Sequence, residues 1–446
     1  MGGQGPTASS PSLPFGRQLR KDFLFDDDYI NINHGSFGTY PHQVRDVLRH
    51  WQDRHEARPD QFIRYDYPKL MVESRAALGS LLNAPIETLV CVPNATSGIN
   101  TVLRNLVFEP GDKILYFATT YGSCELTVKY ITETTPAEDV KVQYTYPVSD
   151  DYLVQAFRDA VKKEKEAGNR VKVAMFDTIV SLPGVRMPYE RLTEACRELG
   201  VFSLIDGAHG VGHIELDLGK LDPDFFISNC HKWLFVPRGC AVFYVPVRNQ
   251  YLIRSTLPTS HGFQPRPKPG MNFINPLPPS GDSRFVSNFN FVGTIDSSPY
   301  LCIPAAIAYR ASLGGEAAIR EYCFDLARRG GKRVAEILGT KVLENEEGTL
   351  GECCFSNVLL PLDLSKCQEL AASKGKDVDS VPSVVKIWAS KVIVMEYGGF
   401  QAFIEYAGGW WVRLSAQIYL EMADFEWVAE VIKKVCERAN AGEFLE

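Results

Sequence analysis

The chain has 446 residues, of which 45% are hydrophobic and 23% are charged, a composition typical of soluble globular proteins. Its formal net charge of −7 argues against a nucleic-acid partner, and no apolar run approaches the roughly 20 residues that a membrane-spanning helix needs. We therefore expect neither nucleic acid nor membrane as a partner. The length predicts a large domain with a smaller one attached.

The N-terminal residues are unlike the rest of the chain. The first dozen are rich in Gly, Pro and Ser and lack the apolar stretch of a signal peptide. We predict a flexible tail over residues 1–24. Residues 25–58 are predicted to pack on the small domain and to border the opening of a site.

Short apolar runs alternate with amphipathic helical stretches from about residue 89 to residue 245. Strands are predicted at 88–92, 113–117, 171–176, 201–205 and 241–245, and helices at 98–106, 124–132 and 189–199. This alternation predicts an α/β domain with a mostly parallel central sheet flanked by helices. In such sheets ligands bind at the carboxyl ends of the strands.

The pattern changes after the last of these strands. Residues 258–299 are dominated by Pro, Gly and Ser, and a loop of this length is usually functional. A helical pattern follows from Pro304 to Leu338, and then short strands and helices reach the C-terminus. We therefore predict a large domain over 59–304 and a small α+β domain over 305–446.

The eleven cysteines show no metal-type Cys-x-x-Cys pair and are scattered through apolar segments. In a chain of this length, such thiols are usually buried and reduced. We expect no metal site and a reducing compartment, of which the cytosol is the simplest choice. Cys124 is expected to be a small buried apolar residue.

Asp206 and Lys232 are the first candidates for chemistry. Asp206 ends a predicted strand, and Lys232 lies in the sequence Asn-Cys-His-Lys-Trp. A lysine can hold pyridoxal 5'-phosphate as a Schiff base, and a carboxylate can keep the pyridine nitrogen protonated so that the ring accepts electrons. Each residue also has an ordinary alternative, a helix N-cap for Asp206 and a solvated surface charge for Lys232.

The pentapeptide Asn-Ala-Thr-Ser-Gly at 94–98 follows a predicted strand and opens a helix. Backbone amides at a helix N-terminus, together with the hydroxyls of Thr96 and Ser97, can bind a phosphate. A plain Ser/Thr cap is the alternative for the pentapeptide alone. Its position ahead of Asp206 and Lys232 favours a cofactor phosphate site.

These motifs together resemble those of fold-type I pyridoxal phosphate enzymes of the class V aminotransferase group. The matching stretches are Asn-Ala-Thr-Ser-Gly at 94–98, Asp-Gly-Ala-His at 206–209 and Asn-Cys-His-Lys-Trp at 229–233. Within this group, residues 31–38 and the Gly-Thr-x-Asp motif at 293–296 resemble the isopenicillin N epimerase-like branch. There the chain is most similar to the fungal hercynylcysteine sulfoxide lyases of ergothioneine biosynthesis.

The resemblance implies the roles at the reactive end of the cofactor. Lys232 would hold the cofactor and remove the Cα proton, and Asp206 would pair with the pyridinium nitrogen. His209 would lie near the phenolic oxygen, and the ring of Tyr121 would stack on the cofactor.

Further cofactor contacts are implied in the same way. The phosphate would be bound by Thr96 and Ser97, with Ser228 and His231 close by and Thr294 reaching over from the other subunit of a homodimer. Asp177 and Ser181 fall in a cofactor-contacting motif, although Thr178 stands where relatives often have His.

Arg413 matches the arginine that binds the substrate α-carboxylate, a task that suits a planar guanidinium. A structural ion pair is the alternative. Asn33, His34 and Phe37 are expected to line the same opening. For His34 the alternative is a turn residue hydrogen-bonded to the backbone.

The fold alone cannot choose among the reactions that this cofactor supports. A cysteine desulfurase carries a cysteine on the loop before the carboxylate-binding arginine, but residues 396–403 contain none. We therefore expect a C–S lyase that acts by β-elimination and yields a sulfenate or thiol, pyruvate and ammonia. The resemblance implies hercynylcysteine sulfoxide as the substrate. Tyr121 is expected either to protonate the leaving sulfur group or only to stack on the cofactor. An amino-acid epimerase or aminotransferase is the alternative.

The leaving group implied by the resemblance carries a quaternary ammonium, which aromatic surfaces bind well. The aromatic candidates are Phe37, Tyr40, Trp410 and Trp411. Core packing is an equal alternative for each of them.

Overall fold

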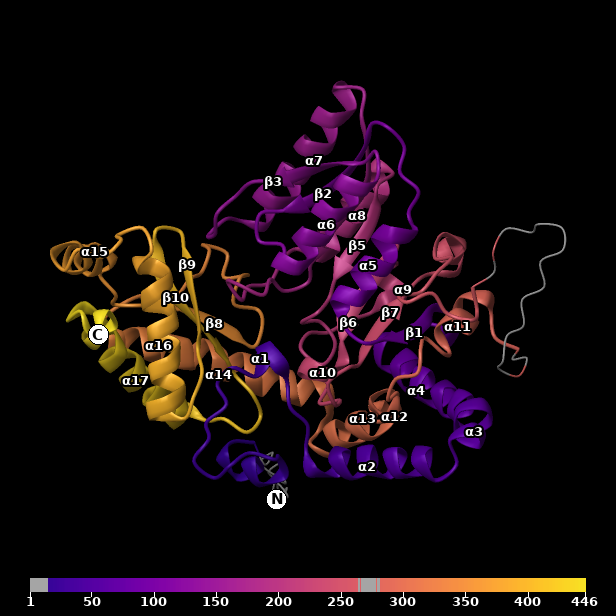
Figure 1. The fold of residues 1–446 in the computed structure, drawn as a ribbon, viewed down its shortest axis with the longest axis horizontal. Helices are drawn as coiled ribbons and strands as arrows, with labels where there is room; N and C mark the ends of the chain where they lie inside the picture. Colours follow the sequence, from indigo (N-terminus) through magenta and orange to yellow (C-terminus); the bar gives the residue numbers. More distant parts are fainter. Residues whose placement is uncertain (1–14, 264, 266–277, 279–280) are drawn as a thin grey trace, which may run out of the picture.

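The computed structural model describes residues 15–263, 265, 278 and 281–446. Its centre is a seven-stranded sheet in the order β1-β7-β6-β5-β4-β2-β3 (Figure 1). The strands are β1 (Leu89–Val92), β2 (Asp112–Phe117), β3 (Glu138–Val142), β4 (Arg170–Asp177), β5 (Phe202–Asp206), β6 (Phe225–Asn229) and β7 (Ala241–Tyr244). Only β7 runs antiparallel to its neighbours, so the predicted mostly parallel sheet is confirmed.

Helices cover both faces of this sheet (Figure 1). They include α5 (Ala95–Asn105), α6 (Gly122–Thr134), α7 (Asp150–Glu166), α8 (Tyr189–Leu199), α9 (Leu218–Leu221) and α10 (Cys230–Trp233), with short turns η3 (Ile86–Thr88) and η4 (Val247–Leu252). Along β4, Ala174 and Phe176 belong to the apolar core on one face and Val173 and Met175 to that on the other. Successive side chains of a strand alternate between faces, so a strand buried on both sides is apolar throughout.

The C-terminal part contains a three-stranded antiparallel sheet in the order β8-β10-β9. Its elements are β8 (Phe355–Leu359), β9 (Ala402–Tyr406), β10 (Gly409–Ser415), α14 (Gly315–Leu338), α15 (Leu364–Ser373), α16 (Val381–Tyr397), α17 (Met422–Asn440) and η5 (Glu443–Leu445). The small α+β unit expected here is present. The expected boundary at residue 305 falls inside α13 (Ile303–Ser312), which packs against the N-terminal helices as well as α14.

The prediction of a flexible tail is wrong for residues 15–24. They contain η1 (Arg17–Asp22), and Leu19 and Phe23 are buried because they pack on the C-terminal part. Arg20 also donates to the Tyr419 carbonyl at 3.3 Å. The chain continues through α1 (His34–Phe37), α2 (His42–Ala57), α3 (Pro59–Gln61), η2 (Phe62–Asp66) and α4 (Tyr67–Leu82).

The strands β3 and β6 and the helix α7 are among the elements that were not predicted from the sequence. Strand β3 carries mostly partly exposed residues, so it lacks the apolar run that marks its neighbours. The stretch 258–299 also contains α11 (Arg284–Phe289) and ends in α12 (Ser298–Leu301). Much of the rest of that predicted loop lies outside the described residues.

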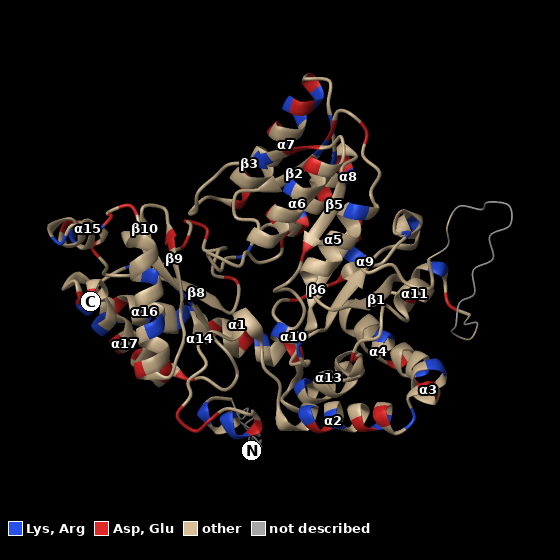
Figure 2. Ribbon diagram, viewed as in Figure 1, with Lys and Arg blue, Asp and Glu red and all other residues tan. Residues whose placement is uncertain are grey.

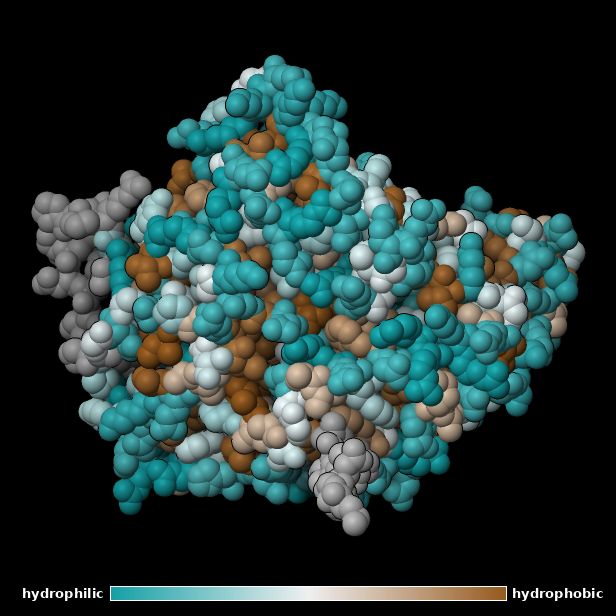
Figure 3. All heavy atoms as spheres, turned by 180° about the vertical axis from the view of Figure 1, so that it is seen from behind, coloured by the Kyte–Doolittle hydropathy of each residue, from teal (hydrophilic) through white to brown (hydrophobic). Residues whose placement is uncertain are grey.

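Charged side chains of both signs are interspersed over the helices, and the central strands carry few of them (Figure 2). From behind, hydrophilic residues cover much of the surface, with separate groups of apolar residues between them (Figure 3). Within the described part of the chain, no helix is both long and apolar enough to cross a bilayer.

Candidate active site

Two carboxylates and a lysine meet at the carboxyl edge of the central sheet. Asp177 and Asp206 are the last residues of the parallel strands β4 and β5 and lie opposite each other in register. Lys232 lies in α10, directly after β6, the strand next to β5. The edge where the sequence predicted a ligand site therefore holds the predicted groups.

Asp206 is buried and accepts two hydrogen bonds. Its carboxylate accepts one from the Ala208 amide at 3.0 Å and one from the Cys124 thiol at 3.3 Å. Burial raises the pKa of Asp206 despite these donors. Burial and the neighbouring Asp206 raise the pKa of Asp177 well above its usual value. Two adjacent buried carboxylates resist carrying two charges, and the two hydrogen bonds to Asp206 favour the anion there and the proton on Asp177.

Cys124 is buried, as expected, but it does more than fill space. Burial and then the charge of Asp206 raise the pKa of its thiol far above the usual range, so the sulfur keeps its proton. The S–H group therefore acts as a donor that orients Asp206. This contact was not predictable from sequence motifs, because the two residues are 82 positions apart.

Lys232 is partly buried, and its Nζ lies 3.2 Å from Nε2 of His209. Burial and then the positive charge of Arg413 lower the pKa of Lys232 to about 8. The other ring nitrogen of His209 accepts from the Trp233 indole N–H at 3.1 Å. Lys232, His209 and Asp206 thus form one cluster, as the motifs implied.

The start of α5 is the expected phosphate site, and two asparagines organise it. The Asn94 side chain accepts from the Ser97 amide at 2.8 Å and from its hydroxyl at 3.1 Å. Asn229 accepts from the Ala95 amide at 2.9 Å. Among the described residues, the Thr96 amide is the one left without a partner in this first turn. The hydroxyl of Thr96 lies 3.2 Å from the hydroxyl of Ser123, a residue that the motifs did not indicate.

The side chains of Ser228 and His231 form hydrogen bonds with backbone groups of the protein. The Ser228 hydroxyl donates to the Gly207 carbonyl and accepts from the Val211 amide at 2.8 Å, which braces the loop that carries His209. His231 Nδ1 lies 2.8 Å from the Cys240 carbonyl and donates to it. Burial lowers the pKa of His231 to about 4, so the neutral ring offers a phosphate an acceptor and not a donor.

Tyr121 and Thr294 lie at the exposed side of the site. Tyr121 immediately precedes α6, and half of its surface is exposed. Thr294 lines a pocket that also reaches Ser97 of the phosphate turn. The pocket wall is largely apolar and includes Phe62 and Phe289. Thr294 and Ser97 therefore line the same pocket.

Arg413 is a buried cation without an internal counter-ion. It lies on β10 with 2% of its surface exposed, and its guanidinium stacks on the Phe355 ring at 4.5 Å. Within the described residues no carboxylate pairs with it, and its Nε has no hydrogen-bond partner. Burial lowers its pKa to about 10. A buried charge is costly unless it is paired, so this arginine is suited to an anionic ligand.

Neutral oxygens hold the Arg413 guanidinium in place. It donates to the Ser181 carbonyl at 2.6 Å, to the Ser36 hydroxyl at 2.8 Å and to the Asn33 side chain at 3.3 Å. Asn33, expected at the substrate opening, and Ser181, expected to contact the cofactor, thus meet at Arg413. Ser36 was not predicted as a contact, although it lies within the matched motif at 31–38.

His34 forms a hydrogen bond with the backbone, which was the alternative to the expected substrate contact. Its Nε2 lies 2.8 Å from the Lys232 carbonyl and its Nδ1 lies 2.9 Å from the Tyr419 hydroxyl. Burial lowers its pKa to about 3, and both ring nitrogens are occupied. His34 therefore fixes α1 against α10, and the expected substrate contact has no free ring nitrogen to use.

Among the aromatic candidates, Trp410 and Trp411 are buried at 4% exposure each, and the Trp411 indole donates to the Tyr406 carbonyl at 2.9 Å. Core packing accounts for both of them. Tyr40 is partly buried and packs against the main apolar core, whereas Phe37 remains 67% exposed, so the Phe37 ring is free to contact a ligand.

The donor set fits pyridoxal 5'-phosphate. Asp206 supplies an anion for a pyridinium nitrogen, Lys232 an amine, and the start of α5 an amide with hydroxyls for a phosphate. Arg413 supplies an unpaired buried cation for the carboxylate of an amino acid. Fold and site together define a pyridoxal phosphate enzyme.

The family profile described as aminotransferase class-V matches residues 41–264, and the chain belongs to this family. Its cofactor is pyridoxal 5'-phosphate. The chain is 37% identical to the L-cysteine desulfhydrase-like protein lolT1 of Epichloe uncinata, covering 97% of this chain and 98% of that protein. It is 31% identical to the hercynylcysteine sulfoxide lyase of Schizosaccharomyces pombe, covering 95% of this chain and 98% of that protein.

The fold is also that of a solved cysteine desulfurase from Thermococcus onnurineus. The two share a TM-score of 0.69 at 17% identity, covering 96% of this chain and 99% of the other. The predicted resemblance to class V aminotransferases and to the fungal lyases is confirmed.

Proposed function

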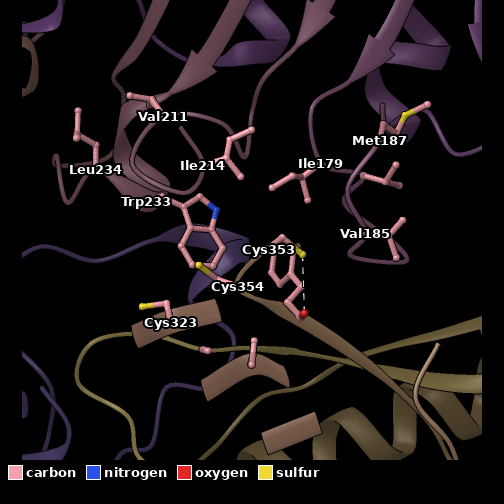
Figure 4. Close-up of a cluster of buried hydrophobic side chains, with 14 of the residues drawn as sticks. Ile179, Val185, Met187, Val211, Ile214, Trp233, Leu234, Cys323, Cys353 and Cys354 are labelled. Carbon is pink, nitrogen blue, oxygen red and sulfur yellow. Dashed lines mark hydrogen bonds between the residues drawn. The ribbon is translucent and has the colours of Figure 1, made fainter. Parts of the chain in front are cut away.

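We propose that the chain is a carbon–sulfur lyase that uses pyridoxal phosphate to cleave cysteine S-conjugates by β-elimination. The observation that carries this proposal is the state of its thiols. All eleven cysteines are buried, and burial raises the pKa of Cys353, for example, to about 12. Cys353 and Cys354 lie in the packed interior (Figure 4). A desulfurase needs a reactive, accessible thiol to take up sulfur, so here the sulfur leaves with its own substituent.

Substrate binding begins at Arg413. Its guanidinium binds the α-carboxylate, while Ser36, Ser181 and Asn33 hold it in a fixed orientation. A carboxylate there neutralises a charge that the chain leaves uncompensated. This contact places Cα of the amino acid on the Lys232 side of the site.

Proton transfer at Cα belongs to Lys232. Its lowered pKa keeps a substantial fraction as free amine near neutral pH, and a free amine can accept the Cα proton. The bound cofactor supplies an electron sink for the pair left at Cα. Asp206 keeps that sink effective because its anion stabilises a protonated pyridine nitrogen.

The Cβ–S bond then breaks, and the sulfur leaves with the bonding pair. Tyr121, half exposed at the start of α6, donates a proton to it. The products are a thiol, or a sulfenic acid from a sulfoxide, and 2-aminoacrylate. Water converts 2-aminoacrylate to pyruvate and ammonia.

The specific substrate that we propose is hercynylcysteine sulfoxide. Its β-elimination releases a sulfenic acid, which two equivalents of an external thiol reduce to ergothioneine with formation of a disulfide and water. Support comes from the similarity to the fungal hercynylcysteine sulfoxide lyase along nearly the whole chain. The exposed ring of Phe37, next in the chain to Ser36, which contacts Arg413, suits the quaternary ammonium of such a leaving group.

The test incubates the cofactor-loaded protein with hercynylcysteine sulfoxide, S-alkyl-cysteine sulfoxides and L-cysteine and measures pyruvate, ammonia and alanine. We expect pyruvate and ammonia in equal amounts, no alanine, and no product from Lys232→Ala. Alanine with protein-bound persulfide would identify a desulfurase and overturn the proposal. Pyruvate from the other compounds but not from hercynylcysteine sulfoxide would support a carbon–sulfur lyase and exclude hercynylcysteine sulfoxide as its substrate.

An epimerase or aminotransferase would use the same Lys232 and Arg413. The same incubation separates them, because an epimerase inverts Cα without forming pyruvate and an aminotransferase needs a keto-acid acceptor. Loss of optical rotation without pyruvate would favour the epimerase.

We also propose a cytoplasmic homodimer. In the enzymes that the chain resembles, the residue at the position of Thr294 reaches the phosphate of the other subunit, and the exposed side chain of Thr294 is open to such a contact. Eleven free thiols favour a reducing compartment. Sedimentation of an active, cofactor-saturated monomer would remove the dimer from the proposal.

A further inference from the structure

The geometry points to Trp233 as a positioning residue that fixes the proton of His209 on Nε2 and thereby holds Lys232 as a free amine ready for the cofactor. This inference rests on Lys232 as the cofactor-binding residue and not on which sulfur compound is cleaved. It concerns a residue for which the motifs implied no role beyond its place next to Lys232.

Trp233 is held rigidly. Its side chain is 1% exposed, and its rings pack 3.9 Å from the ring of His213 and 5.3 Å from that of Phe355. Figure 4 shows it among apolar side chains. Its backbone carbonyl accepts from Arg310 at 2.7 Å. Both ends of the residue are therefore fixed, and so is the direction of its indole N–H.

That direction determines the tautomer of His209. An indole nitrogen can only donate, so Nδ1 of His209, 3.1 Å away, must be the acceptor. A neutral imidazole carries one proton, which must then sit on Nε2. The ring stays neutral because burial, and then the charges of Lys232 and Arg413, lower the pKa of His209 well below its usual value.

The tautomer in turn affects Lys232. The Nε2–H of His209 points at Nζ across 3.2 Å and needs a lone pair there. A free amine has one, whereas an ammonium group has three donors and no acceptor. The ammonium form would place N–H against N–H, so the arrangement favours the amine.

Other charges also act on Lys232. Burial and Arg413 disfavour the ammonium form, and the groups that favour it are Asp206, Asp177 and Cys124. The pKa values of Asp177 and Cys124 are raised, which favours their neutral forms. Asp206 is therefore the main anion that stabilises the ammonium form of Lys232. The Trp233–His209 pair, like Arg413, disfavours the ammonium form of Lys232.

The consequence is for cofactor capture. The amine of Lys232 attacks the aldehyde carbon of pyridoxal phosphate, a C=N bond forms, and one water leaves. Only the free amine has the electron pair for this step. Trp233 thus sets the pH at which the apoprotein takes up its cofactor.

The test follows uptake of pyridoxal phosphate by the apoprotein in stopped flow between pH 6 and pH 10, reading the C=N absorbance. In the wild type the rate should rise through about pH 8, where Lys232 loses its proton. For Trp233→Phe we expect this midpoint to move upward by about one unit, which slows uptake at pH 7 about tenfold. Trp388→Phe, a partly buried indole on α16, is the matched control and should leave the profile unchanged.

A double-mutant cycle separates positioning from packing. If Trp233 acts through His209, adding Trp233→Phe to His209→Gln should shift the midpoint no further. An equal shift in both backgrounds, or a wild-type midpoint in a stably folded Trp233→Phe, would overturn the inference.

A second measurement needs no substitution of Trp233. Nitrogen-15 NMR of histidine-labelled wild-type apoprotein, with His209 assigned from His209→Gln, reports which ring nitrogen carries the proton. A proton on Nε2 supports the inference, and a proton on Nδ1 overturns it even if Trp233→Phe fails to fold.

Discussion

Two buried arginines, Arg310 and Arg413, have opposite surroundings. Arg310 on α13 is 1% exposed, stacks on Phe235 at 4.8 Å, and donates to both carboxylate oxygens of Glu316 at 2.6 Å. Its other donors reach backbone carbonyls at 2.7 and 2.8 Å. Arg413 is buried and stacked in the same way but meets only neutral oxygens, and its Nε has no partner.

The difference separates structure from function. Where the chain supplies the anion, the arginine joins elements of the fold: Arg310 connects α13 to α10 through the Trp233 carbonyl. Where the described residues supply no anion, as at Arg413, the buried cation is paired only when a ligand brings an anionic group. Burial alone does not identify a ligand site, and the missing counter-charge does.

Arg413→Met should give the largest effect. We expect kcat/KM for a cysteine conjugate to fall about 1,000-fold, about 4 kcal/mol, because the substrate carboxylate loses its charged partner. The free energy of unfolding should stay the same or rise, since an unpaired buried charge is removed. Pyruvate assays and urea denaturation measure the two quantities. A destabilised variant with unchanged kcat/KM would place Arg413 with the structural arginines.

Arg310→Met should show the reverse pattern. Its loss leaves Glu316 without its partner and two carbonyls without donors, so the free energy of unfolding should fall by about 3 kcal/mol. The folded fraction should keep most of its kcat/KM. Adding Glu316→Gln should recover part of the lost stability, because the unpaired carboxylate is then gone. No recovery would mean that the carbonyl contacts dominate.

The smallest effects concern the acids. Burial raises the pKa of Glu316, but the charge of Arg310 outweighs it, and the pKa is lowered overall. Its contribution to stability is present above the unfolded value of about 4.3 and is lost as pH falls through the folded value. Glu316→Gln should therefore destabilise at neutral pH and lose this effect on acidification.

Asp177 has the opposite sign because its folded pKa is raised. Its contribution is complete below the unfolded value of about 3.9 and is lost as pH rises toward the folded value. Asp177→Asn should stabilise the protein by about 1 kcal/mol at pH 8 and make no difference near pH 4. Urea denaturation between pH 4 and pH 8 tests both variants, and parallel pH slopes would contradict the contrast.

Much of this site was predictable because its motifs are local. The Asn-Ala-Thr-Ser-Gly turn follows one predicted strand and Asp206 ends another, and parallel strands bring their carboxyl ends to one edge. Lys232 follows β6, which was not predicted, so it was found through its Asn-Cys-His-Lys-Trp motif. Contacts between distant segments were not predictable. The Cys124 thiol on Asp206 and the Ser123 hydroxyl beside Thr96 depend on how α6 packs on the sheet. His34 and Phe37 lie in one motif, but packing buried the first and exposed the second.

The sequence by itself determined the cofactor chemistry, because a lysine, a strand-end carboxylate and a helix-start phosphate turn need only local backbone to present their groups. Only the tertiary structure decided their charge states. Whether Lys232 is an amine, Asp177 an acid or Arg413 an unpaired cation depends on burial and on partners from distant parts of the chain. Water is removed and counter-charges are placed only when those parts pack together, and the pKa values follow from that packing.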